Sequence, residues 1–395
     1  MKNNAVQIPK HLIIATATPH YWWQNKLWGF GPYSKEIDIL APIFNKITIL
    51  SPLLNAEPPK TYLTFKTKYI THKPLPNVGG KHLYNKILGL LTLPKSIYIL
   101  CTNVGKNDGL MARCPSSFGL IATLIGPLLT KFRIAKYAGQ WNGYKEEPFS
   151  VTMQRKILSS SWWSAPVTVY GQWDNQPKHI IAFFTSMMNN AQMKDAIKSF
   201  ESKKNNNQFI RNKRPLKILF SGRLAPEKNI SQLLKALAIL KNKKLSFECK
   251  IIGSGPLKDD LMQESQTLGI FQYITFINGL HYNQCLKQNA WADCLVLPST
   301  HSEGWPKVIA EAMAYGVICI GVDHGQVAKM LEHGGICLKN GTDIEIAQAL
   351  EDVYQNSDKF LTHREKASKW SRQYTTEGLY IKNKELIKKW WANND

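Results

Sequence analysis

Short apolar runs alternate with longer amphipathic stretches along the whole chain. In the first half these runs predict strands at residues 11–17, 46–50, 96–102, 132–139 and 166–171. In the second half they predict strands at residues 216–222, 248–253, 273–279, 293–299, 317–322 and 335–339. Strands that alternate with helical stretches are typical of parallel sheets covered by helices. The pattern therefore predicts an α/β protein with two doubly wound units.

A polar segment rich in Asn and Lys, residues 201–215, separates the two series of strands and has no apolar periodicity. We interpret it as the linker between a first domain at 1–208 and a second at 209–375. Beyond residue 375, the segment 376–391 predicts a basic helix that ends in Trp390 and Trp391.

Composition places the chain among ordinary globular proteins, because 44% of its 395 residues are hydrophobic and 20% are charged. Its seven cysteines contain no Cys-x-x-Cys pair and stand mostly in apolar runs, so we expect reduced core residues of a cytosolic protein. The first residues contain too short an apolar run for a secretory signal. The apolar run 118–130 is also too short to span a bilayer, and predicts a buried crossover helix.

The net charge of +22 is concentrated in the first half. Residues 1–208 contain 25 Lys and Arg against 9 Asp and Glu, whereas the remainder contains 25 against 19. Such an excess attracts phospholipid headgroups, a lipid diphosphate or nucleic acid, although a solvated basic surface is an equal alternative. Nucleic acid fits least, because the sequence has no zinc-ligand spacing, no aromatic RNA-binding signature and no basic-region helix.

The segment 298–311, PSTHSEGWPKVIAE, carries the most specific chemistry. It joins an apolar strand to a helix through a loop, and places Glu303 and Glu311 eight residues apart. Pro306 suits the first helical position, so the helix should begin near Trp305. Gly304 allows the backbone to approach a ligand, and the first helical N–H groups favour an anion. The segment predicts a site for a phosphate that carries a polyol.

Two further strand ends lie upstream of this loop. Residues 217–228, KILFSGRLAPEK, deliver Arg223 and Lys228 into the loop after a strand, and two such cations suit a diphosphate leaving group. Residues 251–261 form another strand that ends in Gly253 and Gly255. A Gly-x-Gly turn alone is weak evidence, but three such loops with two cations and two carboxylates are much stronger.

These motifs resemble a retaining glycosyltransferase of family 4 with the GT-B fold. The resemblance rests on SGRLAPEKN (221–229), IIGSGPL (251–257), ITFINGL (274–280) and LVLPSTHSEGWPKVIAEAMAYGVICIG (295–321), and covers residues 216–342. It implies two Rossmann-like domains facing a central cleft. Residues 1–208 would bind the acceptor, residues 209–375 would bind the nucleotide sugar, and a helix at 376–395 would pack back on the first domain.

The resemblance also implies roles for the matching residues. Arg223 and Lys228 would hold the donor diphosphate, Glu303 would contact sugar hydroxyls, and Glu311 would hold the ribose. Arg223, Lys228 and Glu303 are thus the predicted catalytic residues, and the other predicted donor-binding residues are Gly222, Gly253, Gly279, Gly304, Trp305, Pro306 and Lys307. Asn229 stands where the family often has Gly, and since Asn tolerates left-handed backbone angles we expect the turn to persist.

The first domain matches the family much less. His20 is a candidate base or acceptor contact, with a merely hydrogen-bonded histidine as the alternative. Gly29 and Gly31 are expected to let the loop after the first strand approach the donor diphosphate and the acceptor. Asp108 and Arg113 are candidates either for acceptor contacts or for a structural salt bridge. Many family members present a histidine near the sugar where this chain has Gln140 and Trp141, which we expect to line the donor pocket unless Trp141 lies in the core.

The resulting hypothesis is metal-independent transfer, with retention, from a UDP- or GDP-sugar to a glycan or a polyprenyl- or other lipid-linked acceptor. No Asp-x-Asp motif is present, so we expect no metal or other cofactor. The context that we expect is bacterial surface polysaccharide or lipopolysaccharide synthesis, in the cytoplasm with peripheral contact to the inner face of an anionic membrane. The alternatives are a nucleotide-sugar epimerase or phosphorylase on the same fold, and a catalytically inactive basic binding protein.

Overall fold

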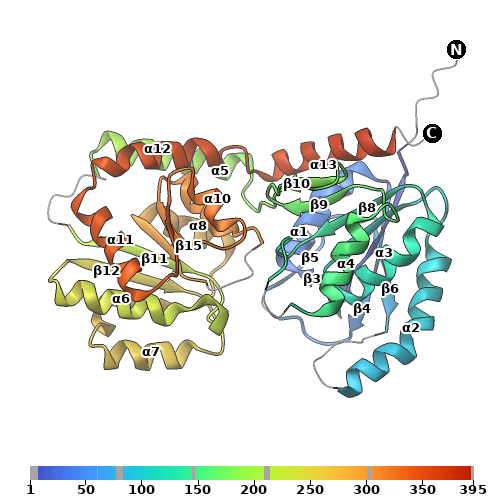
Figure 1. Ribbon diagram of the computed structural model, residues 1–395, viewed down its shortest axis with the longest axis horizontal. Coiled ribbons are helices and arrows are strands. Elements are labelled where there is room, and N and C mark those ends of the chain that lie inside the picture. The colour runs from blue at the N-terminus through green and yellow to red at the C-terminus, as the bar shows by residue number, and fades with distance from the viewer. Residues whose placement is uncertain are drawn as a thin grey trace, which may run out of the picture. The chain divides into compact units, whose positions relative to one another are not determined.

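The computed structural model describes residues 8–59, 61–76, 83–144, 147–208, 214–299 and 304–392, with the backbone alone at 83–90. It divides into two compact units (Figure 1). The first unit comprises Met1–Met187 together with Thr376–Asp395, and the second comprises Met188–Thr375. Each unit is built on its own sheet.

The first unit has a largely parallel sheet with the strand order β10-β9-β8-β7-β1-β4, and β6 also pairs with β4. These strands are β1 (His11–Ala15), β4 (Lys46–Leu54), β6 (Ile70–Leu75), β7 (Gly109–Cys114), β8 (Arg133–Tyr137), β9 (Val167–Tyr170) and β10 (Ile180–Phe183). At the end of β4 the sheet continues through β2 (His20–Trp23), β3 (Lys26–Phe30) and β5 (Tyr62–Thr64). The last two pairings, β2 with β3 and β3 with β5, are antiparallel.

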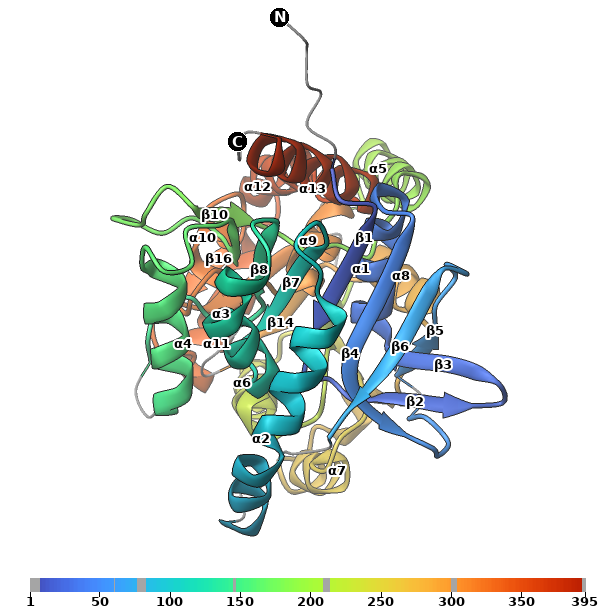
Figure 2. The same ribbon diagram turned by 90° about the vertical axis from the view of Figure 1, so that its right-hand side faces the viewer.

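Helices cover both faces of this sheet. On one face lie α2 (Leu83–Asn103), α3 (Ser117–Leu129) and α4 (Phe149–Ser159), which are neighbours in Figure 2. Helix α1 (Gly31–Leu40), followed by the 3₁₀ turn η1 (Ala41–Ile43), packs against α13 (Thr376–Trp391). Helix α3 confirms the predicted crossover helix, since it connects the parallel strands β7 and β8, but it is not buried throughout because Leu124 and Leu128 are exposed. Among the described residues, no helix has the length and apolar character needed to cross a bilayer.

Helix α13 returns the end of the chain to the first unit, where Trp391 anchors it. The Trp391 side chain is fully buried, and its indole N–H donates to the carbonyl of Arg133 at 3.1 Å. Its ring packs beside Phe44 and Phe132. A Cβ on Gly109 would lie only 2.8 Å from this ring, so the absence of a side chain there makes room for the indole. Of the two terminal tryptophans, Trp391 docks in the core and Trp390 remains partly exposed.

The second unit has an entirely parallel sheet with the strand order β13-β12-β11-β14-β15-β16. Its strands are β11 (Leu216–Ser221), β12 (Phe247–Ile252), β13 (Ile274–Ile277), β14 (Cys294–Leu297), β15 (Ile318–Val322) and β16 (Ile336–Leu338). All six coincide with predicted strands. Most of their residues are buried, as expected for a parallel sheet covered on both faces.

Two apolar cores flank this second sheet. One core contains residues of α6 (Ile230–Asn242), α7 (Lys258–Thr267) and α11 (Asp343–Gln355). The other contains residues of α5 (Asn190–Asn205), α8 (Tyr282–Trp291), α9 (Lys307–Ala314), α10 (Val327–Leu331) and α12 (Lys359–Ser371). Short 3₁₀ turns, η2 (Pro226–Lys228) and η3 (Phe271–Tyr273), complete the unit.

The structure corrects several predictions about the first half of the chain. The segment 96–102 is not a strand but lies near the end of helix α2, in which Ser96 and Leu100 are buried at the helical spacing of four. The strand β7 was not predicted. The predicted linker at 201–215 does not separate the units, because residues as far as Asn205 form α5, which packs on α8 and α9 of the second unit.

The cysteine prediction is partly correct. Cys114, Cys249, Cys294 and Cys319 are buried, but Cys101 and Cys337 are exposed and Cys285 is intermediate. All seven are free thiols. Burial raises the pKa of Cys114, Cys249 and Cys319, so these buried thiols stay protonated.

Candidate active site

The order in which the chain adds strands to the second sheet reverses between β11 and β14. From β11 the chain moves outward to β12 and β13 on one side, and then returns to β14, β15 and β16 on the other. Loops that leave β11 and β14 therefore diverge, and such a point in an open α/β sheet is the usual place for a ligand. The predicted cations follow β11, and the predicted glutamates follow β14.

The loops after β11 and β12 are locked to each other through their backbones. Leu224 donates its N–H to the carbonyl of Ser254 at 3.0 Å, and Leu257 donates to the carbonyl of Leu224 at 3.2 Å. A Cβ on Gly253 would lie 1.8 Å from the carbonyl oxygen of Gly222, and one on Gly255 would lie 2.1 Å from that of Leu224. These glycines are therefore required where one loop backbone crosses the other.

Arg223 lies at the end of β11 and is exposed. Within the described parts of the chain its guanidinium has no hydrogen-bond or ion-pair partner. Lys228 is half-buried at the end of the turn η2, and Asn229 follows it with φ of 51°. That left-handed conformation confirms the expectation that Asn replaces Gly in this turn. Both cations thus lie at the carboxyl edge of the sheet.

The loop after β14 contains residues 300–303, so Glu303 lies outside the described residues. Helix α9 begins at Lys307, with Pro306 as its N-cap and Ile309 donating its N–H to the Pro306 carbonyl at 3.0 Å. The prediction that Pro306 is the first helical residue was therefore wrong by one position. An α-helix leaves its first N–H groups pointing beyond its end, so the start of α9 directs donors and a positive dipole to the carboxyl edge. Gly304 precedes this start and is half-buried.

Glu311 lies on α9 and is held by a residue that the sequence analysis did not single out. The phenol of Tyr282, the first residue of α8, donates to Oε1 of Glu311 at 2.8 Å. Burial raises the pKa of Tyr282 well above its usual range, and the Glu311 carboxylate raises it further, so the phenol remains a donor. Its position shortly after β13 at the carboxyl edge was a signal that could have identified it.

The remaining predicted donor residues divide into two groups. Gly279 is exposed, and a Cβ there would meet only the Ser254 hydroxyl at 3.7 Å, so the space in front of it is open. Asn278 beside it accepts from Lys258 at 2.8 Å. Trp305, in contrast, packs its ring against Tyr374 and Trp370, with centroid distances of 5.0 and 6.2 Å. Its indole therefore packs in an aromatic cluster with α12.

The structure does not support His20 as a base or acceptor contact. His20 is fully buried, with Nδ1 2.7 Å from the Ser51 hydroxyl and 3.1 Å from the Thr18 carbonyl. Burial, reinforced by nearby His72, lowers the pKa of His20 to about 3. A neutral ring enclosed in this way cannot reach a substrate, so His20 is a structural histidine.

Gly29 and Gly31 also serve the fold of the first unit. The predicted loop after the first strand is instead the β2–β3 hairpin, whose turn residues Gln24 and Asn25 have φ of 50° and 56°. A Cβ on Gly29 would lie 2.6 Å from the Ser34 hydroxyl, and one on Gly31 would lie 2.7 Å from the Thr61 carbonyl. Because these glycines have no side chains, β5 and α1 can pack closely against them. The structure thus gives Gly29 and Gly31 a packing role, where we had expected an approach to the donor.

Arg113 belongs to a buried ionic cluster. Its guanidinium donates to Glu36 at 3.3 Å and lies over the ring of Tyr33, while Lys136 contacts the same Glu36 carboxylate oxygen at 2.6 Å. Burial alone would raise the pKa of Glu36, but Lys136 and Arg113 outweigh it and lower that pKa to about 2. Arg113 was predicted either to contact the acceptor substrate or to form a structural salt bridge. The structure shows the salt bridge, with Glu36 as its partner.

Asp108, the other candidate acceptor contact, also has structural partners. Its carboxylate accepts from the backbone N–H of Gly105 at 2.9 Å and lies 3.3 Å from His11.

Trp141 and Gln140 follow β8. Trp141 is 3% exposed, and its indole donates to Gln176 at 3.0 Å while its ring meets that of Tyr137 edge to face. The structure therefore places Trp141 in the core of the first unit, which was the alternative to lining the donor pocket. Gln140 is half-buried, and its role stays a prediction.

No group of three or more Asp, Glu, His or Cys side chains suited to a metal ion occurs in the described part of the chain. The described loops after β11 and β14, with helix α9, contribute the charged side chains of Arg223, Lys228, Lys307 and Glu311, among others.

Comparison with known proteins identifies the second unit. Residues 201–374 match the family model for glycosyl transferases group 1. The chain is 28% identical over 148 residues to a GDP-mannose-dependent alpha-(1-6)-phosphatidylinositol monomannoside mannosyltransferase of Mycolicibacterium smegmatis, covering 35% of this chain and 38% of that protein. It is 28% identical over 124 residues to the amylovoran biosynthesis glycosyltransferase AmsK of Erwinia amylovora, covering 30% of each. The chain matches no more than about half the length of its first relatives.

The fold of the whole chain resembles solved glycosyltransferase structures. Anabaena Alr3699/HepE, solved in complex with UDP and glucose, aligns with a TM-score of 0.66 at 16% identity, covering 95% of this chain and 98% of that one. The two Rossmann-like units and this likeness confirm the predicted GT-B fold. Residues 201–374 form a glycosyl transferases group 1 domain within that fold.

Proposed function

We propose that this protein is a retaining, metal-independent glycosyltransferase. It transfers a sugar from a UDP- or GDP-sugar to a glycan or lipid-linked acceptor, in the synthesis of a bacterial surface polysaccharide or glycolipid. The relatives support this context, since one acts on phosphatidylinositol monomannoside and another belongs to amylovoran biosynthesis. The base remains open between uracil and guanine, because a relative is named for GDP-mannose and a solved neighbour holds UDP.

The observation that carries the proposal is that cations follow one strand and a carboxylate follows the adjacent strand, at the point where the strand order reverses. Arg223 and Lys228 follow β11, while α9 with Glu311 follows the adjacent strand β14. A nucleoside diphosphate has the complementary pattern, with an anionic diphosphate next to the hydroxyls of a ribose. Arg223 and Lys228 are assigned to the diphosphate, and Glu311 to the ribose.

The same cations would stabilise the transition state of transfer. When the bond between the anomeric carbon and the diphosphate oxygen breaks, negative charge grows on the departing oxygen. Arg223, Lys228 and the N–H groups at the start of α9 are fixed donors for that charge, and such preorganised donors act most strongly in the transition state. In this proposal they take the role of a divalent cation, and Glu303 contacts hydroxyls of the donor sugar.

The first test is a thermal-shift panel of UDP, GDP, ADP and TDP, each with Mg²⁺ or with EDTA. A ligand that binds only the folded state at 100 times its dissociation constant stabilises that state by about 2.7 kcal/mol. We expect UDP or GDP to raise the melting temperature equally with Mg²⁺ and with EDTA. A shift that requires Mg²⁺ would overturn metal independence, and no shift at millimolar concentration would favour a binding protein.

Transfer and its stereochemistry require a second test. The protein is incubated with the matching nucleotide sugar, with and without a lipid-linked acceptor, and the products are analysed by NMR. We expect release of nucleoside diphosphate that depends on the acceptor, and a product with the anomeric configuration of the donor. Interconversion of sugars without an acceptor would instead identify an epimerase.

We also propose that the first unit docks on an anionic membrane. Large apolar side chains are exposed on the neighbouring helices α2, α3 and α4 and directly after α4, namely Leu91, Tyr98, Leu124, Leu128, Phe149 and Trp162. Exposed apolar side chains gathered on adjacent elements are typical of interaction surfaces. The positive charge of residues 1–208 complements anionic lipid. Docking would bring the enzyme to a lipid-linked acceptor.

A further inference from the structure

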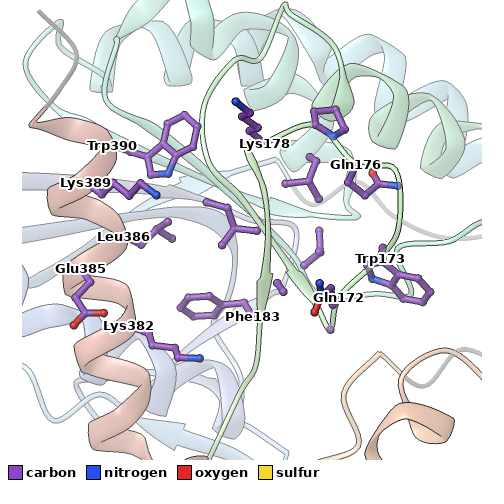
Figure 3. Close-up of a pocket in the computed structure, with 16 residues that line it drawn as sticks. Gln172, Trp173, Gln176, Lys178, Phe183, Lys382, Glu385, Leu386, Lys389 and Trp390 are labelled. Atoms are coloured by element: carbon purple, nitrogen blue, oxygen red, sulfur yellow. The ribbon is translucent and has the colours of Figure 1, made fainter.

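A groove of about 690 Å³ lies between helix α13 and strand β10, within the first unit (Figure 3). The connection from β9 to β10, residues 171–179, contains no helix. Parallel strands are normally covered by the helices that connect them, so this short connection leaves the end of the sheet uncovered. Val169 of β9, Ile180 and Ala182 of β10 and Leu386 of α13 give the groove apolar lining.

The backbone of β10 contributes hydrogen-bonding groups to this groove. The carbonyls of His179 and Phe183 accept from Val167 and Gly171, so alternate residues of β10 face β9. By the alternation of a parallel strand, the carbonyl of Ile180 and both peptide groups of Ala182 face the opposite, outer edge. Both residues line the groove and Ala182 is exposed. A ligand there would meet a donor between two acceptors.

The charged side chains around the groove are mainly positive. Lys178, Lys382 and Lys389 line it, against the single carboxylate of Glu385. Within the described residues none of these four takes part in an ion pair, although Lys382 lies over the ring of Phe184. Ammonium groups that line one groove without an acidic partner favour an anionic ligand.

Aromatic rings complete the lining. Figure 3 shows Trp390 near the end of α13 and Trp173 on the β9–β10 connection itself. Because Trp391 already anchors α13, Trp390 is not needed in the core and is only partly buried. The flat apolar face of an indole packs well on the C–H face of a sugar ring, and its cost in conformational entropy is small.

We propose that this groove binds an acidic oligosaccharide, that is, a short glycan bearing carboxylate or phosphate groups. The three lysines would pair with its acidic groups, the β10 edge would bond its hydroxyls, and Trp390 would pack on a ring. A lipid tail fits less well, since the groove has four charged side chains and backbone polar groups among its lining. Every lining residue belongs to the first unit, whereas the residues assigned to the donor belong to the second. The site thus shares no residue with the donor site of the proposed transfer reaction.

Isothermal titration calorimetry on the full chain, without any nucleotide, tests the proposal separately from transfer. The probes are tetragalacturonate, the neutral tetrasaccharide maltotetraose, a tetra-aspartate peptide and a single-stranded RNA eight nucleotides long. We expect tetragalacturonate to bind at least tenfold more tightly than each of the others. Comparable binding of tetra-aspartate would reduce the groove to a general anion surface, and preference for RNA would assign it to nucleic acid; either result overturns the proposal, as does the absence of tetragalacturonate binding at millimolar concentration.

Matched variants of α13 locate the binding. The double variant K382Q/K389Q removes two charges from the groove, whereas K384Q/K388Q removes two exposed charges from the same helix outside it. We expect the first to weaken tetragalacturonate binding at least fivefold and the second by less than twofold. Trp390→Ala should weaken binding of tetragalacturonate at least fivefold while leaving the melting temperature within about 2 °C. Equal effects of the two lysine pairs, or unchanged binding by Trp390→Ala, would place the ligand elsewhere.

Discussion

Tyr282 donates its phenolic hydrogen to Oε1 of Glu311 across 2.8 Å, and so connects the start of helix α8 with helix α9. This bond fixes the orientation of the carboxylate that we assign to the ribose. We predict that Glu311→Gln raises the dissociation constant of the nucleotide at least tenfold with a smaller change in kcat, because a ribose contact is made equally before and during the reaction. Tyr282→Phe should raise it about fivefold, the scale of one hydrogen bond. Calorimetry with UDP and GDP measures both.

Glu332→Gln is the matched control, because Glu332 is an exposed carboxylate of the same unit. It should leave nucleotide affinity unchanged. If Glu311→Gln binds the nucleotide as tightly as the native protein, the ribose assignment is wrong.

Lys228→Ala should lower kcat by about 100-fold or more, the scale of removing one donor from a developing oxyanion. Lys228 is half-buried at the end of the turn η2, which follows β11 at the carboxyl edge of the sheet. Steady-state kinetics with the donor identified by thermal shift provides the measurement. Lys235→Ala, at an exposed position of α6, is the control and should retain full turnover. Native turnover of Lys228→Ala would remove this residue from the mechanism.

Glu36→Gln should destabilise the first unit by roughly 3 kcal/mol, because it leaves the buried cations Arg113 and Lys136 without their shared carboxylate. Urea unfolding followed by a probe in the first unit reports this free energy. The control is Glu365→Gln, which breaks an ion pair with Lys204 whose side chains are about 40% exposed and should cost less than about 1 kcal/mol. Comparable losses in the two variants would show that the buried cluster does not stabilise the unit.

Acid should destabilise the first unit below about pH 6.5. Burial lowers the pKa of His20 to about 3 and that of His72 to about 4. In the unfolded chain these histidines bind protons below about pH 6.5, whereas in the folded state they stay neutral until the pH is much lower. Their stabilising contribution is full above pH 6.5 and is lost as the pH falls towards 4, at about 1.4 kcal/mol per pH unit for each histidine. Urea unfolding between pH 7 and 4.5 gives the slope.

The variant His72→Gln separates this effect from general acid sensitivity. Its slope should be shallower by the contribution of one histidine, while the exposed His281→Gln should retain the native slope. An unchanged slope in His72→Gln would contradict the assignment.

Membrane docking predicts that Leu128→Glu with Phe149→Glu lowers co-sedimentation with phosphatidylglycerol vesicles at least fivefold. These side chains are 73% and 81% exposed on α3 and α4, so the change should not disturb the core. Ile344→Glu with Ile381→Glu, at 58% and 52% exposure on α11 and α13, adds the same charge elsewhere. Equal losses in both double variants would indicate a charge effect without a defined docking surface.

The second unit could be predicted in detail because each of its strands is a short apolar run closed by a polar or glycine turn. In the first unit, local sequence competed with tertiary structure. Ile97, Tyr98 and Ile99 favour a strand, yet the segment is helical because Ser96 and Leu100 face the core. The β2–β3 hairpin was missed because its turn is Gln24–Asn25, without the glycine that usually marks such turns.

The site residues also divide into those that local sequence could predict and those that depend on residues far away in the chain. Asn229 and the strand-end positions of Arg223 and Lys228 could be foreseen from local spacing. The partners of Arg113 could not, since Glu36 is 77 residues away in sequence and only the register of β7 and β8 brings Lys136 beside it. The burial of His20 likewise depends on Ser51 and Phe65, which come from other strands and loops.

The burial of Trp391 against Gly109 has a consequence for the order in which the chain matures during synthesis. The second unit is one continuous segment, so it can complete its core as soon as Thr375 has left the ribosome. The first unit, although translated earlier, lacks a fully buried indole and the helix that carries it until residue 391 has emerged. Domains usually fold in order from the amino end of the chain, but here the second unit can complete its fold before the first. Until residue 391 has emerged, the apolar surface around Gly109, Phe44 and Phe132 lacks the indole that covers it in the folded unit.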